Sequence, residues 1–356
     1  MSKTSYVPSP TKIKVVGMGG AGCNAITRMV REQIRGVEFI AMNTDAAHLE
    51  ITEAPLRIAL GERLTRGLGA GGDHNVGRRS AEEAKDEIQK AISGADMVFL
   101  AAGMGGGTGT GAIPVVAEMA KKSGALTVAI VTKPFTFEGS RRMQVAEEGI
   151  AQLVAKVDTL IIIPNDRLLE LSDKRTSIEG TFKMADEVLC QAVEAIADVI
   201  TVPGMVNLDL ADIRSVMKDA GPAWMSIGRG SGTNRTVTAA KEALTSPMLD
   251  VSIEGAKGVL FNVVGGSDLT LFEVRDAAKI FEQAVDPEAN IIFGVNVDPN
   301  MGNEVKLTLI ATGFASAAQI SGAAKEMEIN KVLKNLKSDA DLDMPAYMRF
   351  KGKYKR

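Results

Sequence analysis

The sequence is poor in the residues that build metal centres and histidine-based active sites. Its 356 residues include only two cysteines, Cys23 and Cys190, and two histidines, His48 and His74. None of the four lies at a spacing typical of zinc ligands. We therefore expect no zinc site and no histidine-based catalytic triad, and we expect both cysteines to be reduced thiols of a cytoplasmic protein.

A strong charge of either sign and a long apolar run are also missing. Asp and Glu number 44 against 41 Lys and Arg, so the formal net charge is −3. This balance lacks the electrostatic footprint needed to bind nucleic acid or an anionic membrane. No apolar run approaches the ~20 residues that span a bilayer, and MSKTSYVPSPTK at the start has no apolar signal core. The 45% hydrophobic content is enough for a large core, and the length favours two domains.

Glycine, by contrast, is abundant and gathers behind an apolar run. In GMGGGTGTG, residues 103–111, six of nine positions are glycine, directly after the apolar residues 97–102. Glycine in such numbers costs conformational entropy, so we expect the backbone to leave room for a group that comes very close to it. Backbone N–H groups directed into that room, together with the hydroxyls of Thr108 and Thr110, are typical of a phosphate site.

Short apolar runs alternate with segments of helical period from residue 13 to about residue 221. The runs predict strands at 13–16, 37–42, 97–102, 126–131 and 159–163. Between them, Ser80–Glu83 has the form of a capping box for a helix that stops at Gly94, and Pro114 is expected just inside a helix that ends at Gly124. This alternation predicts a parallel sheet with helices on both faces and ligands beyond the carboxyl ends of its strands.

A long helix and a second, smaller layer follow. The helical pattern runs from about 178 to 200, and beyond 221 the sequence predicts strands at 259–264, 291–297 and 305–311 with a helix at 271–284. The predicted fold class is therefore α/β, with a Rossmann-like parallel sheet, a long central helix and a smaller α/β domain built on a mixed sheet.

The first glycine loop leaves two classes of protein open. Gly17, Gly19 and Gly22 satisfy G-x-G-x-x-G after a strand and before a helix, so a nicotinamide-dependent dehydrogenase is a rival hypothesis. The second loop argues against it, because a dinucleotide site has no evident need for another phosphate cradle in the same sheet. The motif G-x-x-x-x-G-K-[ST] is absent, so backbone N–H groups, hydroxyls and helix N-termini would hold the phosphates.

A series of motifs runs in order along residues 12–314. They are GMGGAGCNAITRM (17–29), AMNTDA (41–46), TRGLGAGG (65–72), GMGGGTGTGA (103–112), TKPFTFEG (132–139), IPNDRLLE (163–170), NLDLADIRSVM (207–217), GVLFNVVGG (258–266) and IATGF (310–314). Together they resemble the FtsZ family of prokaryotic cell-division GTPases, within the tubulin/FtsZ superfamily. Cys23 and Leu210 depart from residues common in the family, but neither departure removes a needed polar group.

The resemblance implies a site for GTP or GDP with Mg²⁺. Phe182 and Asp186, at i and i+4 of one helix, would stack on the base and accept from guanine, and Asn165 would meet the purine edge. Glu138 and Arg142 would face the ribose and phosphates, or else form an ordinary helical ion pair. The other residues implied in nucleotide binding are Gly19, Gly20, Ala21, Gly22, Cys23, Asn24, Asn43, Gly71, Gly72, Gly103, Gly105, Gly106, Gly107, Thr108, Gly109 and Pro134.

Metal ligation and hydrolysis need further residues. Asn43, Thr44 and Asp45 follow a strand and could touch Mg²⁺ or its water, but no acidic cluster marks a metal cage, so phosphates and water would hold the ion. Asp209 and Asp212 stand i and i+3 at a predicted helix start, where a plain helix cap explains them equally well. The resemblance implies that they complete, with Asn207, the active site of the next subunit in a head-to-tail filament.

The predicted function is an assembly-dependent GTPase that polymerises into the cell-division (Z) ring at mid-cell. Its rivals are the dehydrogenase and a GTP-binding module of this fold that does not polymerise. The predicted domains are a flexible N-terminus (1–11), a GTP-binding domain (12–177), the central helix with the acidic loop (178–221), a C-terminal domain (222–314), a linker (315–340) and an adaptor-binding peptide (341–356).

That last segment, which contains DLDMPAYMRF, resembles the peptide that ends chains of the family. Its apolar anchors are Met344, Pro345, Tyr347, Met348 and Phe350. Anchors clustered around a proline after a polar linker predict a segment that orders on binding a partner, here a division adaptor protein. The basic residues after position 350 are too few to hold a membrane alone, so membrane attachment is expected to be indirect.

Overall fold

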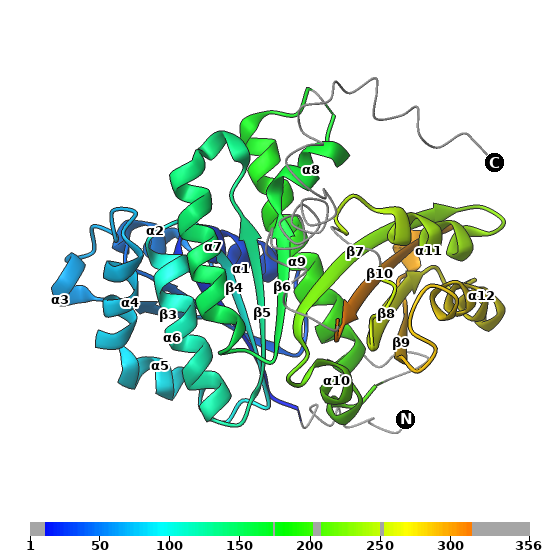
Figure 1. Ribbon diagram of the computed structural model, residues 1–356, viewed down its shortest axis with the longest axis horizontal. Coiled ribbons are helices and arrows are strands. Elements are labelled where there is room, and N and C mark those ends of the chain that lie inside the picture. The colour runs from blue at the N-terminus through cyan, green and yellow to red at the C-terminus, as the bar shows by residue number, and fades with distance from the viewer. Residues whose placement is uncertain (1–10, 174, 202–207, 250–252, 315–356) are drawn as a thin grey trace, which may run out of the picture. The chain divides into compact units, whose positions relative to one another are not determined.

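A computed structural model describes residues 11–173, 175–201, 208–249 and 253–314. Ten strands form one continuous sheet in the order β3-β2-β1-β4-β5-β6-β7-β10-β8-β9 (Figure 1). All neighbours from β3 to β7 are parallel, whereas β10 is antiparallel to both β7 and β8. The sheet therefore confirms the predicted α/β class, with a mixed arrangement at one end. The predicted Asn207, linker and C-terminal peptide lie outside the described residues.

The parallel half contains the five strands that apolar runs predicted and one that they did not. Its strands are β1 (Ile13–Met18), β2 (Val37–Asn43), β3 (Leu56–Ala59), β4 (Met97–Gly103), β5 (Leu126–Lys133) and β6 (Thr159–Pro164). Four of them, β1, β4, β5 and β6, are almost wholly buried, because helices cover both of their faces, which is why they appear as continuous apolar runs.

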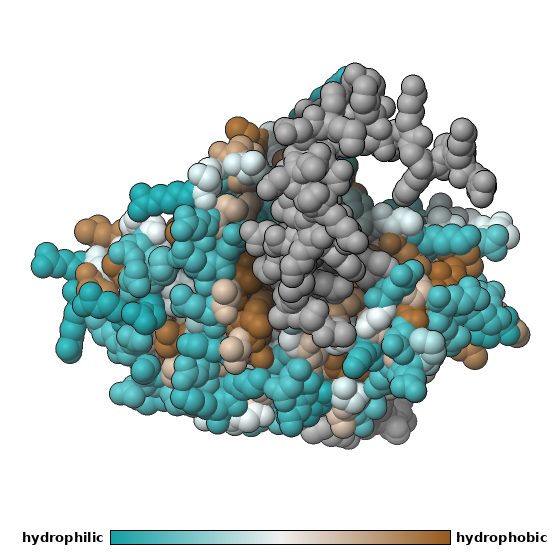
Figure 2. Space-filling view, in the orientation of Figure 1, coloured by the Kyte–Doolittle hydropathy of each residue, from teal (hydrophilic) through white to brown (hydrophobic). Residues whose placement is uncertain are grey.

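Two buried clusters lie on the two faces of this half. One packs the sheet against α1 (Gly19–Arg31) and the long α9 (Ile178–Thr201). The other packs it against α4 (His74–Glu83), α5 (Lys85–Ile92), α6 (Thr108–Lys122) and α7 (Ser140–Val154). The outer surface of this second helix layer is mainly hydrophilic (Figure 2), as expected of amphipathic helices that face solvent.

Two predicted helix starts are wrong. Ser80 does not cap a helix; it is buried inside α4, whose N-cap is Asp73, with its carboxylate accepting from the Asn75 N–H. Asp73 is a strong cap that comes earlier in the chain, and α5 begins only after Ala84. Pro114 lies not in the first turn but well inside α6, which begins at Thr108. The predicted ends hold, since Gly94 and Gly124 follow their helices with φ of +69° and +87°.

The remaining elements are short helical segments and the mixed end of the sheet. Short helical segments are α2 (Ala46–Ile51), α3 (Glu62–Thr65), η1 (Thr136–Glu138), α8 (Asn165–Leu171) and α10 (Leu210–Met217). The mixed end contains β7 (Gly221–Ser231), α11 (Arg235–Thr245), β8 (Gly258–Gly265), α12 (Leu271–Glu282), β9 (Asn290–Val297), η2 (Pro299–Met301) and β10 (Glu304–Thr312). Of these, β8, β9, β10 and α12 were predicted, while β7 and α11 were not.

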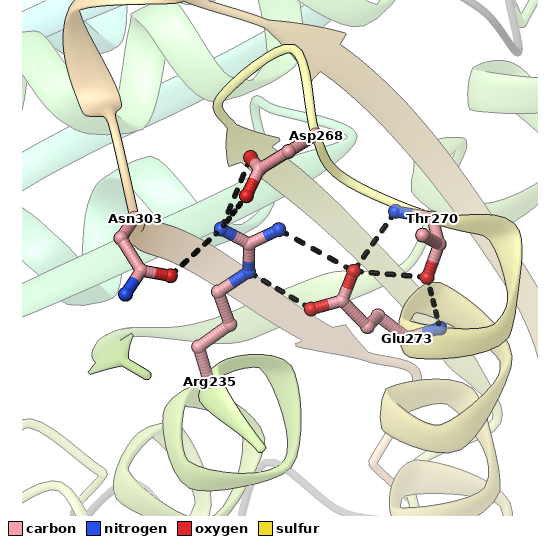
Figure 3. Close-up of polar contacts among 5 residues, drawn as sticks. All are labelled: Arg235, Asp268, Thr270, Glu273 and Asn303. Carbon is pink, nitrogen blue, oxygen red and sulfur yellow. Dashed lines mark hydrogen bonds and ion pairs between the residues drawn. The ribbon is translucent and has the colours of Figure 1, made fainter. Parts of the chain in front are cut away.

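A buried guanidinium joins the elements of the mixed end. Arg235, the first residue of α11, is only 3% exposed, and its Nε donates to Glu273 Oε1 at 2.8 Å (Figure 3). Its Nη1 donates to both carboxylate oxygens of Asp268 at 3.0–3.1 Å and to Asn303 Oδ1 at 3.3 Å. Glu273 also accepts from Thr270, the N-cap of α12. One side chain thus links α11, the β8–α12 turn and the approach to β10, with its charge fully paired.

Candidate functional site

A cavity of about 220 Å³ opens beyond the carboxyl ends of β1, β4 and β5. The N-termini of α1 and α6, the segment after β5 and the first turns of α9 complete its wall. The lining residues are Met18, Gly19, Gly20, Ala21, Gly103, Met104, Gly106, Gly107, Thr108, Gly109, Thr132, Pro134, Glu138, Arg142, Asn165, Phe182, Ala185, Asp186 and Leu189. The structure therefore brings together both glycine loops and the residues predicted to contact a base.

One end of the cavity is built from backbone. A Cβ on Gly19, whose φ is +68°, would lie 2.9 Å from the Gly109 nitrogen, and a Cβ on Gly109 would lie 2.8 Å from the Gly103 oxygen. Glycine is therefore required for these segments to meet. Neither α1 nor α6 has a side-chain cap among the described residues, so their first N–H groups remain available to an anion, which the positive end of each helix dipole also favours.

The helices behind this wall are also in backbone contact. A Cβ on Gly77 of α4 would lie 2.2 Å from the Gly107 oxygen, and one on Gly111 would lie 2.0 Å from the His74 oxygen. The loop before α4 also comes close, because a Cβ on Gly107 would lie 2.8 Å from the Ala70 Cβ. Loop 65–72 is thus the neighbour of the α6 end of the cavity.

Side chains form the opposite end. Asn165 is 5% exposed, and its Oδ1 has no hydrogen-bond partner among the residues that the structure describes. Phe182 is 40% exposed and packs edge-on against Phe135, with ring centroids 5.4 Å apart. Burial raises the pKa of Asp186 to about 7, although the charge of Arg28 opposes the shift. A buried, unpaired acceptor beside an aromatic face and a desolvated carboxyl fits a planar ligand that donates hydrogen bonds.

Glu138 and Arg142 form an ion pair at the rim, with Oε2 and Nη1 3.0 Å apart. They do not share one helix, because Glu138 ends η1 and Arg142 belongs to α7. Glu138 Oε1 also accepts from the Phe135 N–H at 2.9 Å, which holds the carboxylate in place. Arg142 is about half exposed, so its remaining N–H donors are open to an anionic ligand.

Several predicted binding residues do not line the cavity. Gly22 packs against β4, where a Cβ would lie 2.5 Å from the Ala101 oxygen, and Cys23 is buried with its pKa raised to about 11 by burial. Asn24 Oδ1 lies 3.0 Å from His48 Nε2, and Asn43 is buried at the end of β2. Gly105 packs against the Arg142 backbone, while Gly71 and Gly72 belong to the loop before α4.

Lining residues that were not predicted are mostly apolar or end a strand: Met18, Met104, Thr132, Ala185 and Leu189. Helical spacing could have identified two of them, since Ala185 and Leu189 stand three and seven residues after Phe182 on the same helix face. The others adjoin the predicted glycines or the end of a predicted strand.

The acidic pair lies elsewhere. Asp209 is the exposed N-cap of α10 and accepts from the Asp212 N–H at 2.9 Å, while Asp212 accepts in return from the Asp209 N–H at 3.2 Å. The predicted helix cap is therefore present. Arg214 of α10 donates to the oxygen of Asp96, directly before β4, and Thr159, the first residue of β6, donates to the Met217 oxygen.

These contacts place α10 at the amino edge of the parallel strands, opposite the cavity (Figure 1). At ~3.3 Å per residue, a seven-residue strand such as β4 separates the two edges by roughly 20 Å. The acidic pair therefore cannot reach the cavity of its own chain. Among the residues that the structure describes, no group of three or more His, Cys, Asp or Glu is placed to hold a metal, and no helix is long and apolar enough to span a membrane.

Comparison with known proteins gives consistent matches along the chain. The family model for the Tubulin/FtsZ GTPase domain matches residues 12–173, and the model for the FtsZ C-terminal domain matches residues 221–315. An FtsZ dimer from M. jannaschii is 48% identical, over 85% of this chain and 88% of that chain, with a TM-score of 0.83.

Two more distant structures show a likeness of fold alone. GDP-bound CetZ1 from Haloferax volcanii is 22% identical over 89% of this chain and 100% of its own, with a TM-score of 0.76. A GTPγS-bound protofilament of CetZ2 from the same organism is 18% identical over 90% and 99%, with a TM-score of 0.74.

Proposed function

This chain belongs to the tubulin/FtsZ family and is a GTPase, and from that premise we propose how its cavity and its acidic helix divide the reaction. Membership sets aside the nicotinamide-dependent dehydrogenase. The proposal is that GTP binds in the cavity and is hydrolysed when a second copy, stacked head to tail, presents Asp209 and Asp212 to it. The single observation that supports it is that the cavity and the acidic pair lie at opposite edges of one sheet.

The cavity suggests the orientation of the nucleotide. The phosphates would lie against the N-termini of α1 and α6, where uncapped N–H groups and the hydroxyl of Thr108 can donate to them. The base would lie at the other end, stacked on Phe182, with its N1–H and N2 amine donating to Asp186 and to the unpaired Asn165 Oδ1. Adenine presents an acceptor at N1 instead, so the same groups would discriminate against it.

The groups at the phosphate end are hydroxyls and backbone amides rather than carboxylates, which fits an Mg²⁺ ion held chiefly by phosphate oxygens and water. When bound, the ion would neutralise charge on the phosphates. Arg142, held by Glu138, would stabilise the same charge from the rim.

Hydrolysis needs a group that orients and polarises the attacking water. Near the phosphates the lining offers glycines, threonines and the Glu138–Arg142 pair. The Glu138 carboxylate is already engaged by Arg142 and by the Phe135 N–H, so none of these groups is free to take a proton from water. A carboxylate placed permanently beside a triphosphate would repel it, whereas one delivered by a neighbouring subunit acts only after assembly. Asp209 and Asp212, and Asn207 outside the described residues, are proposed to be that group. Exposed apolar residues near the cavity, Leu68 at 85% and Phe137 at 62% exposure, suit a contact with a second copy.

Contact between unlike edges leaves a free edge on each new subunit, so it extends into a filament instead of closing. We propose that these filaments form the division ring at mid-cell. The domain limits given above remain the proposed organisation: 12–177 as the GTP-binding domain, 178–221 as the central helix with the acidic loop, and 222–314 as the C-terminal activation domain. The segment 341–356 is proposed to recruit the filaments to the membrane indirectly, through an adaptor.

Two measurements test the proposal. Purified protein should carry GDP or GTP, identified by chromatography of the released nucleotide, and co-purified NAD would overturn the assignment. Addition of GTP should then raise light scattering, which decays as GTP is consumed. Binding of GTP without scattering at any protein concentration would favour the rival hypothesis, a nucleotide-binding module that does not polymerise.

A further inference from the structure

The acidic helix α10 ends in buried contacts. The last carbonyl groups of a helix lack partners within it, and two of those in α10 accept from threonine side chains. Thr312 Oγ1 donates to the Val216 oxygen at 2.9 Å, and Thr159 Oγ1 donates to the Met217 oxygen. The two threonines are 1% and 0% exposed. A buried carbonyl that lost its donor would stay unsatisfied, so these two bonds hold the end of α10 firmly.

The two donors come from different halves of the sheet. Thr159 is the first residue of β6, in the parallel half, and Thr312 is the last residue of β10, in the mixed end. Because β10 runs antiparallel to β7, its last residue lies at the same amino edge as the first residue of β6. A Cβ on Gly258 of β8 would lie 2.7 Å from Val216 Cγ1, so the mixed end also packs directly against this turn.

The acid end of α10 has weaker attachments. Asp209 and Asp212 are exposed and bond to each other's backbone. Before them, the Leu208 N–H donates to a backbone oxygen of α9 at a long 3.4 Å. Asn290 of β9 donates to Ser215 Oγ at 3.0 Å, but this bond is exposed, and water competes for both groups. The direction of the two carboxylates is therefore set mainly at the buried end of the helix.

Of the two threonines, Thr312 is the less replaceable. On the side of the parallel half, Arg214 also anchors α10, through its bond to the Asp96 oxygen at 3.3 Å. On the side of the mixed end, Thr312 is the one buried side chain that donates to α10 within the described part of the chain. Its loss would release one side of the helix end and allow α10 to tilt about the remaining bonds.

A small tilt at this end becomes a larger displacement at the acids. Asp209 lies seven residues before Val216, which is ~10 Å along a helix that rises about 1.5 Å per residue. A tilt of ~10° would therefore move the Asp209 end of the helix by roughly 2 Å. A misplacement of about 1 Å in a catalytic arrangement can already lower a rate by about 10²-fold.

We propose that Thr312 is a positioning residue for hydrolysis, which holds the acid pair of α10 in the direction of the nucleotide of the next subunit. The inference rests on the proposed function in one respect, the action of Asp209 and Asp212 on a neighbouring copy. It gives the mixed end of the sheet a part in the reaction through one hydroxyl group.

Steady-state kinetics of Thr312→Val, which replaces the hydroxyl by a methyl group, test the proposal. Filament mass is measured by sedimentation with GTPγS, so that turnover is expressed per assembled subunit. We expect kcat to fall about tenfold, less than a complete misplacement of the acids would give. KM and GTP affinity should stay within about twofold of wild type, because the cavity lies at the other edge of the sheet. Thr312→Ser keeps the hydroxyl donor and should restore kcat.

Thr127→Val is the matched control. Thr127 is also buried at the amino edge, in β5, but its hydroxyl donates to the Ala125 oxygen at 3.1 Å and not to α10. The control loses the same group from the same kind of bond, so it should lower the melting temperature without changing kcat. If Thr312→Val does not fold, Thr159→Val removes the other donor to α10, and the same fall in kcat is expected.

The outcomes are distinct. A folded Thr312→Val protein with wild-type kcat would overturn the inference. So would equal falls in kcat in the Thr312 and Thr127 variants, or a fall in GTP affinity as large as the fall in kcat. Where Thr312→Val does not fold, wild-type kcat in Thr159→Val has the same meaning. Asp209→Asn is assayed alongside, because wild-type turnover in that variant would instead remove the proposed function on which the inference rests.

Discussion

The two edges of the parallel strands expose different chemical groups. At the carboxyl edge, glycines and helix N-termini expose backbone donors, and Asp186, the carboxyl proposed to read the base, is desolvated. At the amino edge, α10 presents two carboxylates, exposed to solvent and held by each other's backbone N–H groups. One edge is suited to receive negative charge and the other to deliver it.

Under the proposed mechanism, this division leaves the active site of a single copy incomplete. Each edge is stable by itself, because the donors of the first are arranged by close backbone packing and the acids of the second are satisfied as a helix cap. The proposed reaction depends on bringing the two edges together. Substitutions should therefore separate into those that affect binding at one edge, those that affect turnover at the other, and those that affect neither.

The largest expected effect is at the amino edge. Asp209→Asn keeps a good N-cap for α10 but removes the charge proposed to act on water. We expect GTP turnover to fall about 10²- to 10³-fold, with GTP affinity unchanged because the cavity is roughly 20 Å away. Phosphate release and nucleotide titration measure the two quantities, and scattering after GTP addition should persist rather than decay.

Asp298→Asn provides the control, because Asp298 is also an N-cap aspartate, at η2. It should leave turnover unchanged. A fall in GTP affinity as large as the fall in turnover, in the Asp209 variant, would show that the two edges are not separate.

The next effect concerns the mixed end of the sheet, where charges are satisfied internally rather than offered to a ligand. Arg235→Met leaves Asp268 and Glu273 without their shared partner. We expect the free energy of unfolding to fall by about 3 kcal/mol, with GTP affinity within twofold of wild type. Denaturant unfolding checks the first value. Arg275→Met, which breaks an exposed pair with Asp276, should lower the free energy of unfolding by less than about 1 kcal/mol. An equal decrease in the two variants would mean that the buried Arg235 contacts stabilise the protein no more than an exposed ion pair does.

A smaller effect is expected from pH at the base end of the cavity. In the proposed site the ionised form of Asp186 accepts from guanine, and burial raises the pKa of this carboxyl to about 7 in the free protein. GTP affinity should therefore fall about tenfold per pH unit below 7, measured by titration between pH 5.5 and 8. Asp186→Asn should abolish this dependence and weaken the preference for GTP over ATP. An unchanged preference would refute its role in reading the base.

The same group predicts an opposite effect on stability. A carboxyl whose pKa is raised on folding contributes stability below its unfolded pKa, and this stability is lost as the pH rises through about 7. The nucleotide-free Asp186→Asn protein should therefore melt at a higher temperature than wild type at pH 7.5. This gain would identify the carboxyl as a binding group retained at a cost to folding.

The smallest effect on either edge is expected from removing residues 341–356. GTP turnover and scattering should stay within about twofold of wild type, because both edges lie within residues 12–314. In sedimentation with lipid vesicles that carry a membrane-bound adaptor, however, the truncated protein should be absent from the pellet. A truncated chain recruited as well as the full chain would contradict the role proposed for this peptide.

The sequence predicted the parallel half better than the mixed end for a physical reason. Strands buried on both faces must be continuous apolar runs, and all five that were predicted are present. In β7 the run is interrupted by Ser226, Gly228 and Gly230. The two glycines are needed because a Cβ would lie 1.9 Å from the Ala239 oxygen or 2.0 Å from the Arg235 oxygen of α11. Because α11 packs so closely on β7 that glycine is required there, β7 lacks the apolar pattern that would have identified it as a strand.

The candidate site shows the same limit. Glycine content alone indicated the phosphate end of the cavity, because the requirement for space acts on the backbone directly. The base end came only from the family resemblance, since an aromatic and an acid at i, i+4 also describe an ordinary amphipathic helix. Nor could spacing show that Asp209 faces away from the cavity, because that depends on how α10 packs beneath β4 and β6.

The backbone wall has a consequence for inhibitors that compete with the nucleotide. A compound that contacts only main-chain atoms of the two glycine loops binds a surface where few side-chain substitutions could remove its contacts. Substitution of Gly19 or Gly109 adds atoms at 2.8–2.9 Å from neighbouring backbone, which would disable the protein along with the compound's site. A compound that relies on Phe182 or Asp186 contacts side chains that the fold can exchange, with a loss of base recognition as the cost. Resistance should therefore arise more often at the base end of the cavity than at the phosphate end.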